Sequence, residues 1–295
     1  MAFSVVVCAA APAAAQTFTP PATGSDLRSG ASGELSTLAL NAAIGGLTAG
    51  LARAVQGENF LRGFVRGAAG GTLSYAGKRV AVERWAGAGL LGRQVNAVGG
   101  SMVANAAAGR GALEQVMFAV GPVHVYVDRS AGTAIRPKLD LVSTAALAYA
   151  FTRSGSHLDL GKSLSAGAPV FYTEGSDAPA GEHAAGVIRV TATRESWEAQ
   201  SELAVTVASH ERVHVLQRDF ALLVFAVPAQ HRLLRTLPGG DELDRYLDLG
   251  LQDALSVGLS AVVPYRQRPW EREAYFLSNR PRDHVGEGEF PGPLY

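Results

Sequence analysis

Small and apolar residues dominate the first third of the chain and form three segments that predict helices. Leu35 to Ala52 has no charged residue over 18 positions, near the lower limit for a helix that crosses a membrane. In the next segment, Phe60 to Tyr75, glycines recur every four residues, and a third segment, Gly87 to Ala108, has a similar stripe of small residues (Gly63, Gly67, Gly71; Gly92, Asn96, Gly100). Because residues four apart share one helix face, these stripes predict helices whose backbones lie close together.

Two interpretations of this glycine-rich region are open. The helices could form a bundle on or in a membrane, with membrane contact through residues 35–108. They could also form a tightly packed helical layer of a soluble protein. The segment from Lys78 to Arg84 is too charged to stay in lipid, and charges recur every few residues after Arg53. The pattern therefore favours the soluble layer.

Strand-like patterns replace the helical ones near Gln115. Val123 to Val127 alternates apolar and polar residues, and three other runs are rich in β-branched and aromatic residues (Val116 to Val120, Pro169 to Thr173, Val187 to Thr191). Turn-forming residues fill the gaps. We expect a small antiparallel sheet of about four to six short strands between Val116 and Thr193.

A longer helix is predicted after these strands, capped at its start by Thr193 or Ser196. Leu203, Val207, His210 and His214 follow at spacings of four, three and four, so the two histidines continue an apolar stripe and face the interior. We expect Pro228 to end this helix. Further helices are predicted at Asp241 to Leu249, at Asp253 to Val263, and from Pro269 onward.

The order of these patterns predicts an α+β fold. A glycine-rich helical region (35–112) comes first, then an α+β region (113–278) with the sheet and the histidine-bearing helix, then a loose tail (279–295) rich in proline and glycine.

The start of the chain predicts export. Phe3 to Ala15 is uncharged and apolar and ends in three alanines, as in a signal peptide (1–15) with a cleavage site after small residues. A linker (16–34) rich in Thr, Pro, Gly and Ser would follow. We therefore expect an exported protein that is periplasmic or associated with the cell envelope.

Composition excludes some chemistry. The chain has 26 basic and 26 acidic residues, and a net charge of zero argues against nucleic acid as a partner. Cys8 is the only cysteine, so neither an internal disulfide nor a cysteine-based zinc site can form.

The sharpest motif is His-Glu-x-x-His at residues 210–214. On a helix, His210 and His214 lie on one face and can direct ring nitrogens at one ion. Glu211 then stands where a carboxylate can take a proton from a water molecule bound to the ion. A catalytic zinc takes three protein ligands, and Glu271 and Glu273, on a later predicted helix, are both candidates for the third.

His-Glu-x-x-His-x-x-Gln followed by Glu271-x-x-Ala274 resembles bacterial gluzincin-type metallopeptidases. The resemblance implies a zincin-like region, Zn²⁺ as cofactor, Glu271 as ligand and a peptide or protein as substrate. It also implies an Asp that orients a zinc histidine, but Tyr275 stands at that position. Either another acid (Asp219, Asp241 or Glu242) supplies that contact, or the site is weakened.

These residues predict a mechanism. Glu211 acts as general base toward zinc-activated water that attacks a peptide carbonyl, and then protonates the leaving amine. Three side chains are candidate donors to the oxyanion (Tyr265, Tyr275, His231), and the strand from Val187 to Thr191 is a candidate edge for an extended substrate.

A second function is compatible with the sequence. Tyr275 in place of Asp, and a large glycine-rich region that peptidase chemistry does not need, also fit a non-catalytic envelope or membrane-associated protein with a structural or degenerate zinc site.

Overall fold

The computed structural model describes residues 31–130, 132–175, 180–199, 202–263 and 268–278. The predicted signal peptide, the linker up to residue 30, the tail from residue 279 and Tyr265 lie outside these ranges. Within them the protein is α+β, as the sequence predicted.

Three helices form the glycine-rich region: α1 (Ala31–Val55), α2 (Phe60–Ala81) and α3 (Ala88–Ala107). The side chain of Asn59 caps α2 by accepting from the backbone N–H of Arg62. A Cβ atom added to Gly67 would lie 2.6 Å from the Cβ of Ala49 on α1, so only glycine permits this approach. Two boundaries differ from the prediction: α1 begins inside the predicted linker, and α2 extends through Lys78 because Lys78 pairs with an acid in the interior.

Two four-stranded sheets replace the single antiparallel sheet that we expected. The first has the order β1 (Gln115–Val120), β2 (Val123–Asp128), β3 (Ala134–Asp140), β8 (Leu247–Asp248), and its last pair is parallel. Alternation of apolar residues marks a strand but says nothing about its partner, and β8 arrives from more than a hundred residues downstream. The sequence pattern therefore could not predict which strands pair with one another, or whether a pair is parallel or antiparallel.

The second sheet has the order β4 (Ser156–Leu158), β5 (Val170–Glu174), β7 (Val187–Ala192), β6 (Ala180–Ala184), with β5 and β7 parallel. Along the chain, α4 (Leu141–Thr152) connects β3 of the first sheet to β4 of the second. The helix α5 (Leu160–Ala166) connects β4 to β5. Ala185 and Gly186 join β6 to β7, both at positive φ (48° and 85°), as a two-residue hairpin turn of type I′ requires. In the order of the described strands, β6 is the last strand of this sheet.

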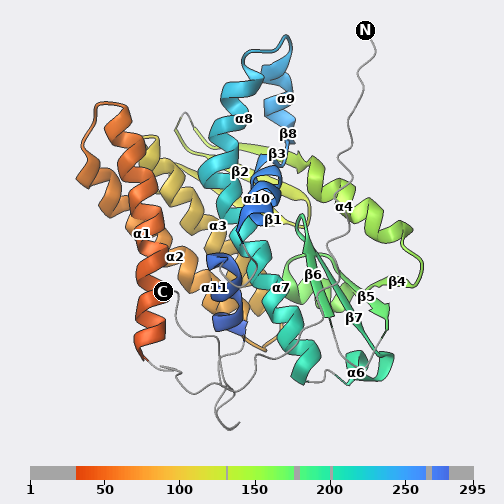
Figure 1. Cartoon of the computed structure of the whole chain (residues 1–295). Coiled ribbons are helices and arrows are strands. Elements are labelled where there is room, and N and C mark those ends of the chain that lie inside the picture. Colours follow the sequence, from red (N-terminus) through yellow and green to blue (C-terminus); the bar gives the residue numbers. More distant parts are fainter. Residues whose placement is uncertain (1–30, 131, 176–179, 200–201, 264–267, 279–295) are drawn as a thin grey trace.

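The histidine-bearing helix is α7 (Glu202–Ala221), and it runs between the glycine-rich helices and the second sheet (Figure 1). Thr193 does cap a helix, but that helix is the short α6 (Arg194–Glu198). Pro228 does not end the helical run: a π-helical turn, η1 (Leu222–Ala226), leads into α8 (Val227–Leu234), where Pro228 lies in the first turn. Proline lacks the N–H that a residue inside a helical run donates, and the π-helical turn directly before α8 already interrupts the regular hydrogen-bond pattern there.

Three helices complete the described chain: α9 (Gly240–Tyr246), α10 (Leu251–Val262) and α11 (Pro269–Ser278). Pro269 opens α11, as predicted. The core lies on both sides of α7: Val215 and Leu216 pack with the second sheet, and Val213 packs with α2 and α11. The histidine-bearing helix is thus held from opposite sides.

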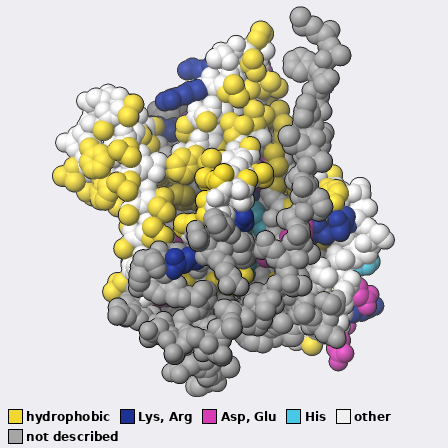
Figure 2. Space-filling model, viewed as in Figure 1, with side chains coloured by type: hydrophobic (Ala, Val, Ile, Leu, Met, Phe, Trp, Pro, Cys, Tyr) yellow, Lys and Arg dark blue, Asp and Glu magenta, His cyan; other side chains and the backbone are white. Residues whose placement is uncertain are grey.

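One helix among the described residues is long and apolar enough to cross a membrane, Gly33–Val55 within α1. A third of its most apolar window is buried inside the protein. On its outer side Ile44, Leu47 and Leu51 are exposed, and Figure 2 shows hydrophobic side chains over this part of the molecule. Core helices of soluble proteins and signal sequences share these properties.

Candidate metal centre

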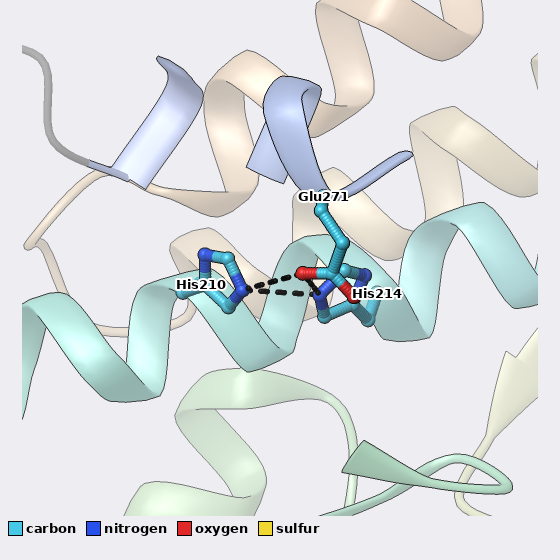
Figure 3. A group of neighbouring side chains, drawn as sticks. All are labelled: His210, His214 and Glu271. Carbon is cyan, nitrogen blue, oxygen red and sulfur yellow. Dashed lines mark hydrogen bonds and ion pairs between the residues drawn. The ribbon is translucent and has the colours of Figure 1, made fainter. Parts of the chain in front are cut away.

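Two helices bring three ligand atoms together (Figure 3). The Nε2 atoms of His210 and His214, one turn apart on α7, are 3.1 Å from each other. Oε2 of Glu271, from α11, is 3.3 Å from the first and 3.2 Å from the second. Within the described chain these are the residues whose ligand atoms cluster closely enough to hold one ion.

Packing between α7 and α11 explains why Glu271 reaches the histidines. Ala274 and Leu277 on α11 are fully buried against Val213 of α7, and Tyr75 and Val82 complete this cluster. Because Ala274 has only a methyl group, α11 can lie close to α7. Glu271, one turn before Ala274, is thereby directed at the two ring nitrogens.

The spacing of the three atoms fits a tetrahedral zinc ion. Ligands at about 2.0–2.1 Å from a tetrahedral ion are about 3.3–3.4 Å from one another. The observed separations are 3.1–3.3 Å. Two imidazoles and one carboxylate are also ligand types that catalytic zinc takes, with one position left for water or substrate.

Glu273 is not placed as a ligand. Its carboxylate accepts from Lys78 Nζ (2.8 and 3.0 Å), from Asn41 Nδ2 (2.7 Å) and from Gln217 Nε2 (2.8 Å). Glu271 and Glu273 are both buried. The structure therefore contradicts Glu273 as the alternative ligand.

The charges around the cluster favour a cation. Burial lowers the pKa of His210 to about 4, so this ring is neutral at pH 7. Burial also acts to lower the pKa of His214, but the charge and hydrogen bond of Glu271 outweigh it and raise that pKa to about 9. Burial likewise disfavours the charged form of Glu271, yet the two histidines hold its pKa below the usual range. In the metal-free protein a proton on His214 thus supplies the positive charge that the carboxylate demands.

Glu211 lies beside the cluster, next to the second sheet. Its side chain is 7% exposed, and burial raises its pKa to about 7. A Cβ atom added to Gly181 of β6 would lie 2.7 Å from Oε1 of Glu211. Glycine at this point therefore allows β6 to run directly along the carboxylate.

The position of Tyr275 changes what surrounds His210. The Tyr275 ring packs on the His210 ring, with centroids 4.4 Å apart. Nδ1 of His210 has no hydrogen-bond partner among the described residues. Asp219 pairs with Arg93 in the interior, whereas Asp241 and Glu242 lie near surface arginines, so none of the three replaces the missing Asp.

His214, by contrast, has an orienting partner that the sequence did not suggest. Its Nδ1 is 2.8 Å from Oε1 of Gln217, one turn later on α7. In the sequence, Gln217 is only the polar residue three positions after the second histidine, and that spacing alone does not show where its amide points.

Of the candidate donors to the oxyanion, His231 lies far from the cluster and Tyr275 lies beside it. His231 is on α8, where it is half-exposed and pairs with Asp244. It follows His214 by 17 positions along nearly continuous helix, or about 25 Å, which is too far to reach a substrate at the cluster. Tyr275 is the one of the three that the described structure places beside the ligands.

Two residues near the cluster were not found from the sequence, Gly181 and His183. The ring centroid of His183 is 6.2 Å from that of His214, and its Nε2 accepts the backbone N–H of Gly186. Burial holds the pKa of His183 well below its usual value. Strand pairing, and not helical spacing, brings them to α7, so no short motif could reveal them.

The predicted substrate edge is also corrected. The strand β7, which contains Val187 to Thr191, is paired on both sides and has no free edge. Its neighbour β6 ends the sheet order of the described strands and lies against α7. In Figure 2, histidine and acidic side chains are visible between the hydrophobic surface and the atoms drawn grey.

Comparison of the chain with protein-family models, curated proteins and solved structures finds no match. The function proposed for the protein therefore rests on the geometry of the site alone.

Proposed function

We propose that this protein is a zinc-dependent hydrolase of peptide bonds. The observation that supports it most is the triangle of ligand atoms from His210, His214 and Glu271, spaced at 3.1–3.3 Å. It comes with a buried carboxylate, Glu211, directly after the first ligand.

Bound zinc would act as a Lewis acid, which lowers the pKa of a coordinated water molecule and polarises a carbonyl oxygen. The chain supplies the rest. Glu211, buried beside the ligands, accepts a proton from the attacking water and passes it to the departing amine. Tyr275, whose ring packs on that of His210, is our candidate donor to the oxyanion.

The edge strand β6 supports a peptide as substrate. An unpaired strand edge offers N–H and C=O groups to an extended chain, which then adds as a further strand. Gly181 sets β6 against Glu211, so a peptide paired to β6 would pass the general base. This pairing uses backbone groups and requires no particular side chain of the substrate. We therefore propose extended peptides as the class of substrate.

A non-catalytic protein with a structural metal site is the second candidate. The unpartnered Nδ1 of His210 favours it, because metal-binding histidines usually donate their other ring N–H to an orienting group. Such a protein would bind zinc and cleave nothing.

One substitution separates the two. Glu211→Gln keeps the shape of the side chain but removes the proton acceptor. We expect it to keep the zinc content of the parent and to lose cleavage of a library of unfolded peptides by at least about 100-fold. Equal cleavage by parent and variant would exclude Glu211 as general base, and no cleavage by a zinc-loaded parent would support the structural site.

A further inference from the structure

The glycine-rich helices contribute to the candidate metal centre through a buried polar chain. We propose that Lys78 on α2 and Asn41 on α1 are positioning residues for the ligand His214, acting through Glu273 and Gln217. The inference rests on the proposed zinc site but not on peptide hydrolysis. It gives the first two helices a role that the proposed reaction does not otherwise assign to them.

Gln217 fixes the tautomer of His214. An amide oxygen can only accept a hydrogen bond, so His214 donates from Nδ1 to Oε1 of Gln217 at 2.8 Å. The lone pair of a neutral His214 is then on Nε2, the atom that faces His210 and Glu271. Loss of this contact would allow the other tautomer, which has a proton where the ion must bind.

Glu273 fixes the orientation of the Gln217 amide. The NH₂ group of Gln217 donates to Oε2 of Glu273 (2.8 Å) and to the backbone carbonyl of Trp270 (2.9 Å). If the amide were turned over, its oxygen would face these two acceptors and its NH₂ would face His214. These two acceptors therefore select the orientation that presents the amide oxygen to the histidine.

Lys78 and Asn41 hold the carboxylate of Glu273 in place in the interior. Lys78 is 4% exposed and Glu273 is 6% exposed, and both carboxylate oxygens contact Nζ. Asn41 donates to Glu273 and accepts from Lys78 at 2.9 Å, so the three groups close a ring of contacts. Without these partners nothing among the described residues of α1 and α2 would hold the Glu273 carboxylate in the position from which it accepts from Gln217.

Close packing of α1 and α2 makes this ring of contacts possible. A Cβ atom added to Gly71 would lie 2.8 Å from the backbone carbonyl carbon of Asn41. Glycine on α2 thus allows Asn41 to lie near Lys78, and both side chains extend to α11. The regular spacing of small residues on α2, which is also typical of packed membrane helices, therefore allows the contact between Asn41 and Lys78.

The affinity of the full-length protein for zinc, measured by competition with a chromogenic chelator, tests the proposal. We expect Gln217→Leu and Lys78→Met each to lower zinc affinity about 10–100-fold, the usual effect of removing an orienting partner. The absorption spectrum of the cobalt-substituted protein should change in both, because the geometry of His214 changes.

A double-mutant cycle decides whether Lys78 acts through Gln217. If it does, Lys78→Met has no further effect on zinc affinity in the Gln217→Leu background. Additive losses would overturn the proposal. Arg93→Met is a matched control, because Arg93 and Asp219 also form a buried pair that includes a residue of α7. An equal loss of zinc affinity in this control would show a general loosening of α7 and would also overturn it.

Lys78→Met alone leaves the charge of Glu273 buried and unpaired, so a second variant removes both charges. Replacing a buried pair by apolar residues is often neutral for stability. We therefore expect Lys78→Met combined with Glu273→Leu to fold, as judged by circular dichroism, but to bind zinc about 10–100-fold more weakly than the parent. Parental zinc affinity in this folded variant would contradict the proposal. A zinc-binding parent that cleaves no peptide would contradict the proposed function and leave this inference standing.

Discussion

Gly67 provides the sharpest test of how α1 and α2 are packed. Its α-carbon faces α1, and an added Cβ would lie 2.6 Å from the Cβ of Ala49 and 2.9 Å from the carbonyl carbon of Gly45. The carbonyl oxygen of Gly45 would be closer still. Because backbone atoms cannot rotate away as side chains can, Gly67→Ala must push the two helices apart.

Two opposing effects set the magnitude. Alanine stabilises a helix interior by about 1 kcal/mol relative to glycine. Overpacking typically costs about 1–3 kcal/mol. We expect Gly67→Ala to lower the free energy of unfolding by up to about 2 kcal/mol, as the difference between these two effects.

Gly258 in α10 is the control, because a Cβ atom added there meets no atom within 4 Å. Gly258→Ala should therefore raise the free energy of unfolding by up to about 1 kcal/mol. Urea unfolding followed by far-ultraviolet circular dichroism measures both variants under the same conditions. If Gly67→Ala stabilises the protein as much as Gly258→Ala does, the close contact between α1 and α2 is refuted.

Three further predictions concern the site and its support. Because the metal-free protein holds a proton on His214 up to a pKa of about 9, zinc binding at pH 7 should release about one proton, and zinc affinity should rise between pH 7 and 9. Calorimetry in buffers of different ionisation enthalpy counts the protons, and a count of zero would contradict this charge assignment. Gly181→Val, whose side chain would collide with Glu211 and Val207, should keep zinc but lower peptide cleavage about 100-fold, and unchanged cleavage would argue against β6 as the strand beside the general base. Leu216→Ala, at a fully buried position under the second sheet, should lower the free energy of unfolding by about 2–5 kcal/mol in urea titration, whereas a loss below about 1 kcal/mol would show that this core is not tightly packed.

Local patterns in the sequence predicted much of the helical structure because the information is local. The glycine stripes, Thr193 as a cap and Pro269 as a first-turn residue each act within a few positions of chain, and each does so in the structure. Pro228 was misjudged because a π-helical turn before it is not encoded in any simple spacing.

Contacts between distant segments set the limit of sequence inference. Helical spacing put His210 and His214 on one face, and the short Glu-x-x-Ala pattern suggested Glu271. Glu273 remained an alternative in the sequence, and the structure separates the two: packing of Ala274 on α7 directs Glu271 to the histidines, whereas Glu273 pairs with Lys78. Gly181 and His183 reach α7 through strand pairing, which leaves no periodic signal at all.

The zinc content of the protein tests the central claim most directly. Metal-free protein is equilibrated with zinc, gel-filtered and analysed by plasma mass spectrometry, with Glu271→Ala treated in parallel. The geometry of His210, His214 and Glu271 predicts about one zinc per chain in the parent and little or none in the variant. A parent that retains no zinc, or a variant that retains as much as the parent, would contradict the assignment of these three residues as a metal centre.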